Sequence, residues 1–401
     1  MLTDDGVDLD EVPCRLLRDG TLELDLGEED GPTHRVTPWE EGFDVHVRGR
    51  AVKHDPGVAL FYAASLGHGP APLQAFARGI PAAVLHAARV AGVYEWSALR
   101  MLRACEGVQD LATSAPNLLW LVAGSVAERD VHPRALGDVL RAKRPALLAW
   151  ALEGEVAPEH VRFLEKLQLV ERDAAERTRV LRALRAPEVV RAARHCERIS
   201  AAALEELVDL PRALCDAAFV GDALRRGDAV DLRRAPELVR DCVRLAGIMG
   251  DNAHGLWKRP TVESLACLHD RWVAALPRRR PDLVRVLMEQ GSALLPHAPL
   301  EASTDIVPIR TVLELWVESV QMAHCAYARL GSYRRGRAFV FRVLRPERAT
   351  LEVRCVGEEL VLWELRAAQN RPVSAETELA VRHWFEGQPG AAHRPLHPWE
   401  W

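Results

Sequence analysis

The sequence is poor in lysine, the first of several features that it lacks. Of its 52 basic residues only four are lysines, at Lys53, Lys143, Lys166 and Lys258, and the rest are arginines. Arginine favours bidentate binding of phosphate or carboxylate groups, but codon usage in a GC-rich genome explains the same bias. The formal net charge of -5 argues against a chain that binds nucleic acid or anionic lipid over its whole surface. A local basic patch is still compatible with this composition.

The chain also lacks paired cysteines and long apolar runs. None of its eight cysteines forms a C-x-x-C pair, and no run of about 18 apolar residues occurs. We therefore interpret the cysteines as packed thiols in a reducing compartment, and we expect no membrane span. The acidic opening MLTDDGVDLDEVP has neither the basic nor the apolar segment of a signal peptide. These features predict a cytoplasmic protein with no membrane partner.

Common enzyme motifs are absent as well. The sequence contains no Walker loop, GxGxxG, HExxH, GxSxG or protein-kinase signature, which disfavours the usual nucleotide and hydrolase chemistries. Cys267 and His269 lie two residues apart in an expected helix, on opposite faces, so they cannot share a tetrahedral metal ion without ligands from elsewhere. We predict neither a metal site nor a cofactor.

The patterns that are present predict an α+β protein that is predominantly helical. Residues 1–54 contain short runs of alternating polar and apolar residues, which indicate a β-rich segment. Residues 55–293 carry apolar residues at helical spacing, interrupted by proline and glycine. Within them PNLLWLVAG (116–124) and PALLAWALEG (145–154) echo each other, which is typical of stacked helical hairpins in a solenoid, although chance recurrence of a Pro-helix-Gly pattern explains it equally well.

The last part of the chain has its own pattern. Residues 294–307 are rich in proline and are predicted to be a linker. Residues 308–388 follow as a compact unit: a helix that ends near Gly331, three antiparallel strands with short connections, and a closing helix. Residues 389–401 are expected to form an extended tail.

His324 and Cys325 lie near the end of the first helix of this unit. A helix C-terminus stabilises an imidazolium, so His324 could act as an acid-base group, with Cys325 as a nucleophile and Glu352 as an orienting carboxylate. Adjacent helical residues point about 100° apart, so the two cannot form a self-contained pair. The alternative interpretation is a packed histidine whose hydrogen bonds are satisfied.

Arginines cluster between this helix and the first strand. Arg334, Arg335 and Arg337 flank Gly336, and residues 278–280 add three more arginines. Together they form the best candidate for an anion or nucleic-acid patch. A solvated turn is the alternative.

Five short motifs occur in order and at compatible spacing between residues 308 and 386. They are His324-Cys325, Gly336-Arg337, Thr350-Leu351-Glu352, Asn370-Arg371-Pro372 and Trp384. This set resembles the PcfJ-like domain, named for a protein of conjugative plasmids, and the helical region upstream is typical of its longer members. The resemblance implies an accessory part in plasmid transfer and DNA processing, without a known reaction. The chain departs from the pattern at Arg329, where an aromatic residue is usual, at Glu364 (usually Gln) and at Ala367 (usually Gly).

These observations predict an accessory nucleic-acid-associated or scaffolding protein, with nucleic acid and another protein as its partners. Its C-terminal unit would bind a phosphate or a nucleotide-like ligand. The residues that we expect to hold the ligand are Arg335, Arg337, Arg342, His324, Asn370 and Cys325. Two alternatives stay open: a hydrolase or nuclease that uses His324 with Glu352, and a module that binds only other proteins.

Overall fold

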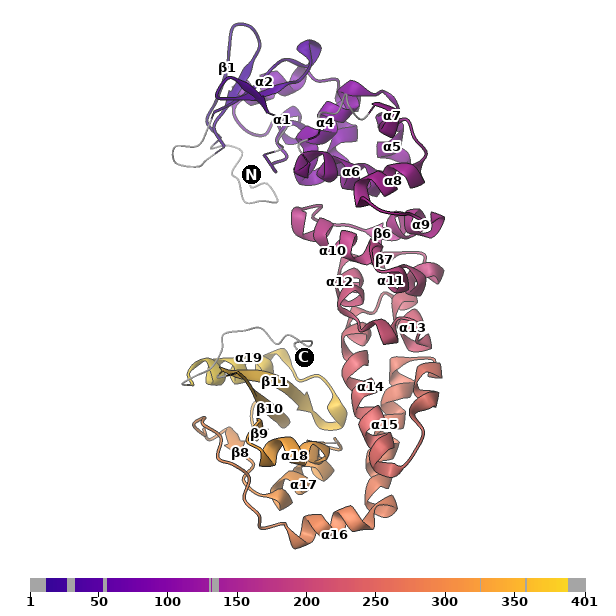
Figure 1. The fold of residues 1–401 in the computed structure, drawn as a ribbon. Coiled ribbons are helices and arrows are strands. Elements are labelled where there is room, and N and C mark those ends of the chain that lie inside the picture. The colour runs from indigo at the N-terminus through magenta and orange to yellow at the C-terminus, as the bar shows by residue number, and fades with distance from the viewer. Residues whose placement is uncertain are drawn as a thin grey trace. The chain divides into compact units, whose positions relative to one another are not determined.

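The structure is a computed structural model that describes residues 12–26, 33–52, 56–129, 131, 137–324, 326–357 and 359–388. It is an α+β fold, predominantly helical, as the sequence predicts (Figure 1). The chain divides into an N-terminal unit, Met1–Asp216 with Val220–Leu232, and a C-terminal unit, Ala217–Phe219 with Arg233–Trp401. None of the described helices is long and apolar enough to cross a membrane.

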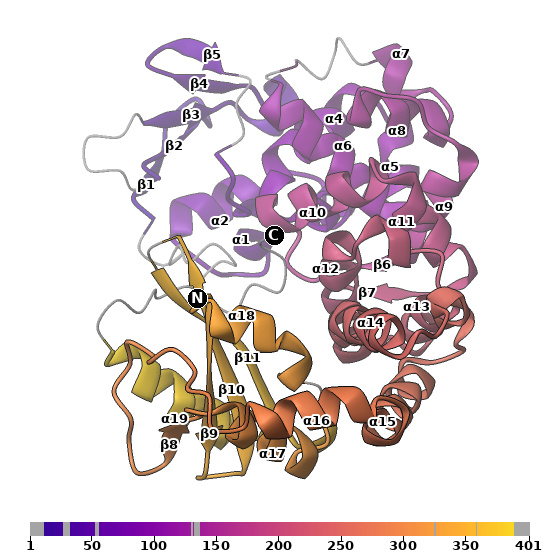
Figure 2. The same cartoon turned by 60° about the horizontal axis from the view of Figure 1, so that its bottom comes forward.

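The N-terminal unit begins with the predicted β-rich segment. Its five antiparallel strands lie in sequence order, as Figure 2 shows. Leu22, Leu24 and Val36 are fully buried, which gives this small sheet its apolar face. The strands are β1 (Cys14–Leu16), β2 (Leu22–Leu24), β3 (His34–Val36), β4 (Val45–Val47) and β5 (Arg50–Val52).

Short helices make up the rest of this unit, and several of them begin at a proline, which costs no hydrogen bond at a first helical position. The segments that echo each other form α6 and α8, which pack together, and Trp120 of α6 is fully buried. The helices are α1 (Phe61–Ser65), α2 (Ala71–Arg78), α3 (Ala82–Ala88), α4 (Glu95–Ala104), α5 (Gly107–Ser114), α6 (Pro116–Glu128), α7 (Gly137–Leu140), α8 (Arg144–Leu152), α9 (Pro158–Lys166), α10 (Ala174–Leu184), α11 (Pro187–Ala192) and α12 (Ala201–Asp209), with α13 (Ala218–Arg226) at the boundary between the units.

The C-terminal unit contains three helices before its sheet. They are α14 (Ala229–Met249), whose first turn belongs to the other unit, α15 (Val262–Arg279) and α16 (Pro281–Glu289). The thiol of Cys242 donates a weak hydrogen bond to the carbonyl of Leu265, so α14 and α15 lie against each other. A capping box of Thr261 and Ser264 fixes the start of α15.

The sheet of this unit contains the three predicted strands and one more. These are β9 (Ala338–Val343), β10 (Ala349–Val356) and β11 (Glu359–Ala367), with β8 (Ile306–Pro308) added beside β9, all antiparallel in the order β11-β10-β9-β8. β8 could not be predicted from the sequence, because it is only three residues long and ends in proline, a residue confined to sheet edges. The segment proposed as a linker leads into it, and Ala298 and Leu300 lie in the core of the sheet.

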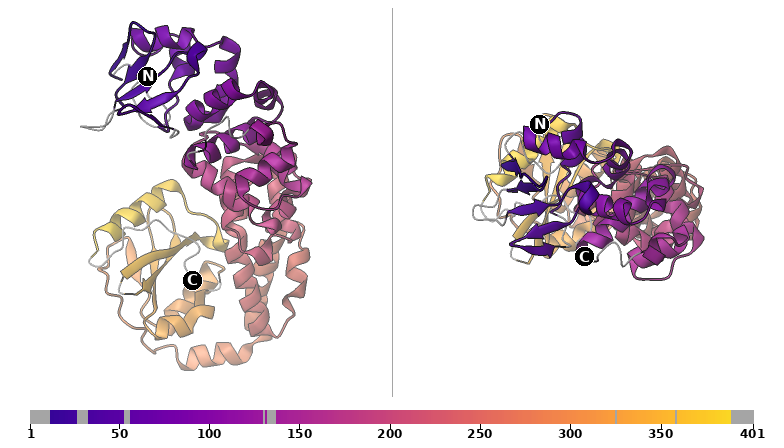
Figure 3. Two further views of the ribbon diagram at one scale, coloured as in Figure 1. Left: turned by 45° about the horizontal axis from the view of Figure 1, so that its top comes forward. Right: turned by 90° about the horizontal axis from the view of Figure 1, so that it is seen from above.

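Helices cover both faces of this sheet (Figures 1 and 3). Side chains alternate between the faces, so Phe341 packs with Phe385 of α19 (Ala375–Glu386), whereas Val340 packs with Leu315 of α17 (Val312–Gln321). The single helix expected up to Gly331 is divided, because Ala323 takes a positive φ of 49° after α17, and α18 (Leu330–Arg334) begins later.

Candidate functional site

The sheet face under α17 and α18 carries polar side chains from three strands. Arg342 of β9 and Arg366 of β11 lie opposite Thr350 of β10, and Glu364 of β11 lies opposite Glu352 of β10. Residues two apart on a strand share a face, so this register brings all five to one side of the sheet. We call this side the polar face. Thr350 and Glu352 are buried there.

His324 is buried against the polar face, with 4 % of its surface exposed. Its Nε2 lies 2.8 Å from the hydroxyl oxygen of Thr350, and that hydroxyl donates a 2.6 Å hydrogen bond to Glu318. Nε2 therefore carries the proton, and Nδ1 is left to accept from the backbone N–H of Ala326 at 3.4 Å. Burial lowers the pKa of His324, so the ring is neutral at pH 7.

Glu318, on α17, neutralises Arg342. The carboxylate is fully buried and accepts hydrogen bonds from Nε of Arg342 at 3.1 Å and from the guanidinium of Arg348. Because a buried carboxylate requires such partners, Arg342 has a structural role in this arrangement. It is not available as a free cation for a ligand.

Arg329 is the cation at the centre of the polar face, and its side chain is 9 % exposed. One terminal nitrogen donates to Glu352 at 2.7 Å and to Glu364 at 2.5 Å, and the other lies 3.4 Å from Asp241 of α14. Although burial opposes the charge of Glu364, the guanidinium groups of Arg329 and Arg366 lower the pKa of this carboxyl to about 2. Arg329 and Glu364, both departures from the PcfJ-like pattern, therefore form an ion pair.

Glu352 has further partners. It accepts a 2.7 Å hydrogen bond from the hydroxyl of Tyr333 and a 2.5 Å hydrogen bond from Nε of Arg354. Burial and the Glu352 carboxylate raise the pKa of Tyr333 well above its ordinary value, so the phenol stays protonated. With Arg329 also donating, Glu352 accepts three hydrogen bonds.

A narrow cavity of about 30 Å³ lies within these groups. It has room for about one or two water molecules. His324, Glu352 and Asn370 all line it. Asn370 follows Gln369 in a left-handed turn, with φ of 54° and 60°, and the N–H of Gln369 donates to the carbonyl of Met322 at 2.7 Å.

A larger cavity of about 440 Å³ opens beside the narrow one, and we call it the arginine pocket. Among the described residues that line it, none is acidic. Arg335 and Arg337 take part in no ion pair or side-chain hydrogen bond, and the buried Nε of Arg329 finds no partner within the part of the chain that the structure describes. The pocket is lined by Arg240, Arg244, Arg329, Gly331, Ser332, Arg335, Arg337, Ala338, Arg354 and Cys355.

Two other arginines of the arginine pocket, Arg244 and Arg354, are held in place by neighbouring side chains. Arg244 pairs with Asp241 at 3.1 Å. The guanidinium of Arg354, held by Glu352, lies over the ring of Trp363 at 3.8 Å from its centre. These contacts fix the positions of the guanidinium groups before any ligand binds, which lowers the entropic cost of binding.

The structure thus distributes the predicted site residues over two neighbouring cavities. His324, Glu352 and Asn370 line the narrow cavity, and Arg335 and Arg337 line the arginine pocket. Arg342 is paired with Glu318. Cys325 lies outside the described residues.

Sequence reasoning missed the contributions of α14, because they lie about a hundred residues from the motifs. Glu237, Arg240, Asp241 and Arg244 recur at intervals of three and four, which places them on one face of the helix. That charged stripe is the signal that could have indicated a partner surface. The arginines at 278–280 lie elsewhere: Arg279 pairs with Asp251 and Arg280 pairs with Asp282.

Within the described ranges, no group of three or more His, Cys, Asp and Glu side chains is placed to hold a metal ion. His269, which is buried, lies 3.0 Å from Asp270 through Nδ1 and 3.5 Å from the amide of Asn370 through Nε2. This arrangement tethers the Asn370 turn to α15. Comparisons with protein-family models, curated proteins and solved structures find no match to the chain.

Proposed function

We propose that the C-terminal unit binds a phosphate-bearing ligand in the arginine pocket, and that the protein acts as a nucleic-acid-associated accessory or scaffolding protein. The observation that carries this proposal is the pocket itself: six arginines line one cavity of about 440 Å³, and none of its described lining residues is acidic. Arg335 and Arg337 have no counter-charge within the described chain, and an anionic ligand would supply one.

Phosphate is the anion that suits this pocket best. A guanidinium donates two parallel hydrogen bonds to a phosphate group, and several of them together suit a group with more than one charge. Arg335 and Arg337 are free to turn toward a ligand, while Arg244 and Arg354 are held in place. The hydroxyl of Ser332 adds a hydrogen-bonding group at the same pocket.

Nucleic acid is the phosphate source that we favour. The resemblance to the PcfJ-like domain, which implies a part in DNA processing, supports this choice. The helical part of the chain would then present a surface to a protein partner. The hydrolase alternative receives less support, because His324 is neutral and buried and Glu352 already accepts three hydrogen bonds. The cavity between them, about 30 Å³, has room for only about one or two water molecules.

Fluorescence anisotropy with a labelled single-stranded oligonucleotide, measured over a series of salt concentrations, tests the proposal. Replacing Arg335→Gln and Arg337→Gln together removes two phosphate contacts, so we expect weaker binding and a salt slope that is smaller by about 1 to 2. Arg345→Gln is the matched control, since Arg345 is a largely exposed arginine outside the pocket, with its side chain 82 % exposed. Saturable binding that is unchanged in the double variant, or no binding at all, would contradict the proposal.

A further inference from the structure

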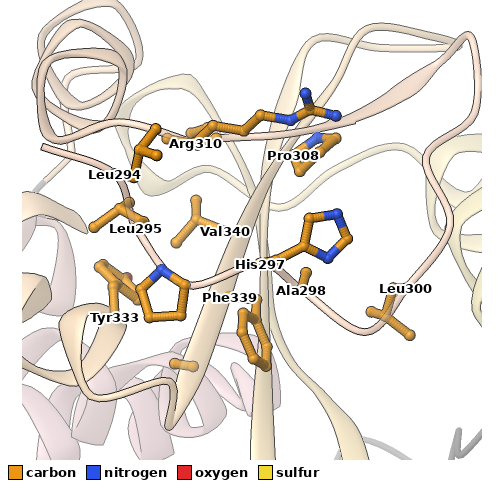
Figure 4. A pocket seen from close by; sticks show the side chains of 13 residues that line it. Leu294, Leu295, His297, Ala298, Leu300, Pro308, Arg310, Tyr333, Phe339 and Val340 are labelled. Carbon is orange, nitrogen blue, oxygen red and sulfur yellow. The ribbon is translucent and has the colours of Figure 1, made fainter. Parts of the chain in front are cut away.

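A third cavity of the C-terminal unit has a different chemical character. It has a volume of about 280 Å³, and Figure 4 shows the side chains that surround it. The segment from Leu294 to Leu300, the end of β8 with Ile309 and Arg310, and the start of β9 form its walls. We call it the apolar pocket.

Most of the lining is hydrocarbon. Of the thirteen lining residues, only His297, Arg310 and Tyr333 carry polar side chains. The hydroxyl of Tyr333 already donates a hydrogen bond to Glu352, so Tyr333 contributes its ring to the wall of the cavity. The apolar lining residues include Leu295, Ala298, Leu300, Ile309, Phe339 and Val340. Such walls favour an apolar molecule over water.

Two exposed side chains that can bind an anion, those of Arg310 and His297, line this cavity. In Figure 4 the guanidinium of Arg310 and the ring of His297 lie on the same side of it, next to Pro308. Neither side chain makes an ion pair or a hydrogen bond within the described part of the chain. The carboxylate of Glu314 accepts from the backbone N–H of Arg310, at 2.7 Å, as part of the cap of α17, and leaves the guanidinium unpaired.

We propose that the apolar pocket binds a small amphipathic carboxylate, with its hydrocarbon part in the cavity and its carboxylate on Arg310 and His297. An apolar cavity of about 150 Å³ accommodates benzene, so this one suits a body of roughly ten to twelve carbon atoms. Ligand sites of this size typically combine apolar walls with a few polar groups that orient the ligand. The inference is independent of the arginine pocket, since Arg310 does not line that cavity.

The test uses three probes with the same hydrocarbon chain: decanoate, decan-1-ol and decylamine. We expect isothermal titration calorimetry to show one saturable site for decanoate, with at least tenfold weaker binding of the alcohol and the amine. Arg310→Gln should weaken decanoate about tenfold and leave decan-1-ol unchanged, since one charge-assisted hydrogen bond is lost. His297→Ala should have a smaller effect in the same direction.

Controls separate this inference from the proposed function. Arg345→Gln, which removes an exposed arginine outside the cavity, should bind decanoate like the unaltered protein, and so should the Arg335→Gln, Arg337→Gln double variant. Circular dichroism establishes that each variant is folded. Equal affinity for the three probes, no saturable decanoate binding, or unchanged binding by a folded Arg310→Gln variant would overturn the inference.

Discussion

The narrow cavity and the arginine pocket share Arg329 in their lining, yet their charges are arranged in opposite ways. In the narrow cavity every cation meets carboxylates, as Arg329 does with Glu352 and Glu364. In the arginine pocket, Arg335 and Arg337 form no ion pair with a carboxylate within the described chain. Paired buried charges hold elements together, whereas unpaired charges in an open cavity are available to a ligand. His324 therefore belongs to the region of paired charges, and the binding site that we propose is the arginine pocket beside it.

The largest effect that we expect comes from removing the shared cation. Arg329→Ala removes the one cation of the described chain that contacts all three carboxylates, Glu352, Glu364 and Asp241, and we expect it to lower the free energy of unfolding by about 3–5 kcal/mol. Urea denaturation at pH 7 measures this value. Arg345→Ala, at an exposed position, should change it by less than about 0.5 kcal/mol. A loss below about 1 kcal/mol in Arg329→Ala would contradict the assigned role of the network.

A second effect should appear in acid. The pKa of Glu364 is about 2 in the folded protein, below its ordinary value of 4.5. As the pH falls, the unfolded chain therefore binds the proton before the folded protein does. Stability from Glu364 is therefore present above about pH 4.5 and is lost as the pH falls toward about 2, by on the order of 3 kcal/mol in full.

Glu364→Gln provides the measurement of this second effect. The difference in free energy of unfolding between the protein and the variant should narrow as the pH falls from about 6, down to the lowest pH at which both fold. Glu237, whose pKa is raised by burial and by Glu364, acts in the opposite sense, so only the difference is informative. A difference that stays constant with pH would show that Glu364 is not held ionised by Arg329 and Arg366.

A smaller pH effect is expected from His324. Burial lowers the pKa of His324 from its ordinary value of 6.5. The repulsion of Arg329 acts in the same direction, whereas the attraction of Glu318 and Glu364 opposes the shift. The unfolded chain therefore takes up this proton first, and stability should fall as the pH drops below 6.5. Urea denaturation of His324→Gln should lack this loss. If the variant showed the same loss, the neutral, buried state of His324 would be wrong.

The smallest effect on stability is expected from the two arginines of the arginine pocket that make no ion pair in the described chain. Arg335→Gln and Arg337→Gln should each change the free energy of unfolding by less than about 0.5 kcal/mol, because neither side chain is paired in the described chain. Thermal unfolding followed by circular dichroism measures this. A loss of more than about 1 kcal/mol would mean that these arginines hold the fold together and are not free for a ligand.

The fold was largely accessible from the sequence, since alternation and helical spacing report burial directly. The meander of β9, β10 and β11 follows from the alternating residues, and the start of α17 follows from the cap formed by Thr311 and Glu314. The division of the first helix was not accessible, because it depends on the turn at Ala323 that places His324 against Thr350.

The site was accessible only in part. The Gly336 turn indicated Arg335 and Arg337, but the partners of the charged residues come from elements distant in sequence, such as Asp241 of α14. A single sequence does not reveal which arginines are neutralised: Arg342 pairs with Glu318, whereas Arg337 makes no ion pair within the described chain.

Cys355 offers the most direct test of the arginine pocket, because its exposed thiol lines this cavity, while the exposed Cys267 of α15 does not. The measurement is the rate of alkylation of each thiol by N-ethylmaleimide, followed by peptide mass spectrometry, with and without a saturating single-stranded oligonucleotide. We predict that the oligonucleotide slows the reaction of Cys355 several-fold and leaves Cys267 unchanged, and that Arg335→Gln with Arg337→Gln abolishes the protection. An oligonucleotide that binds but leaves the reactivity of Cys355 unaltered would contradict the account.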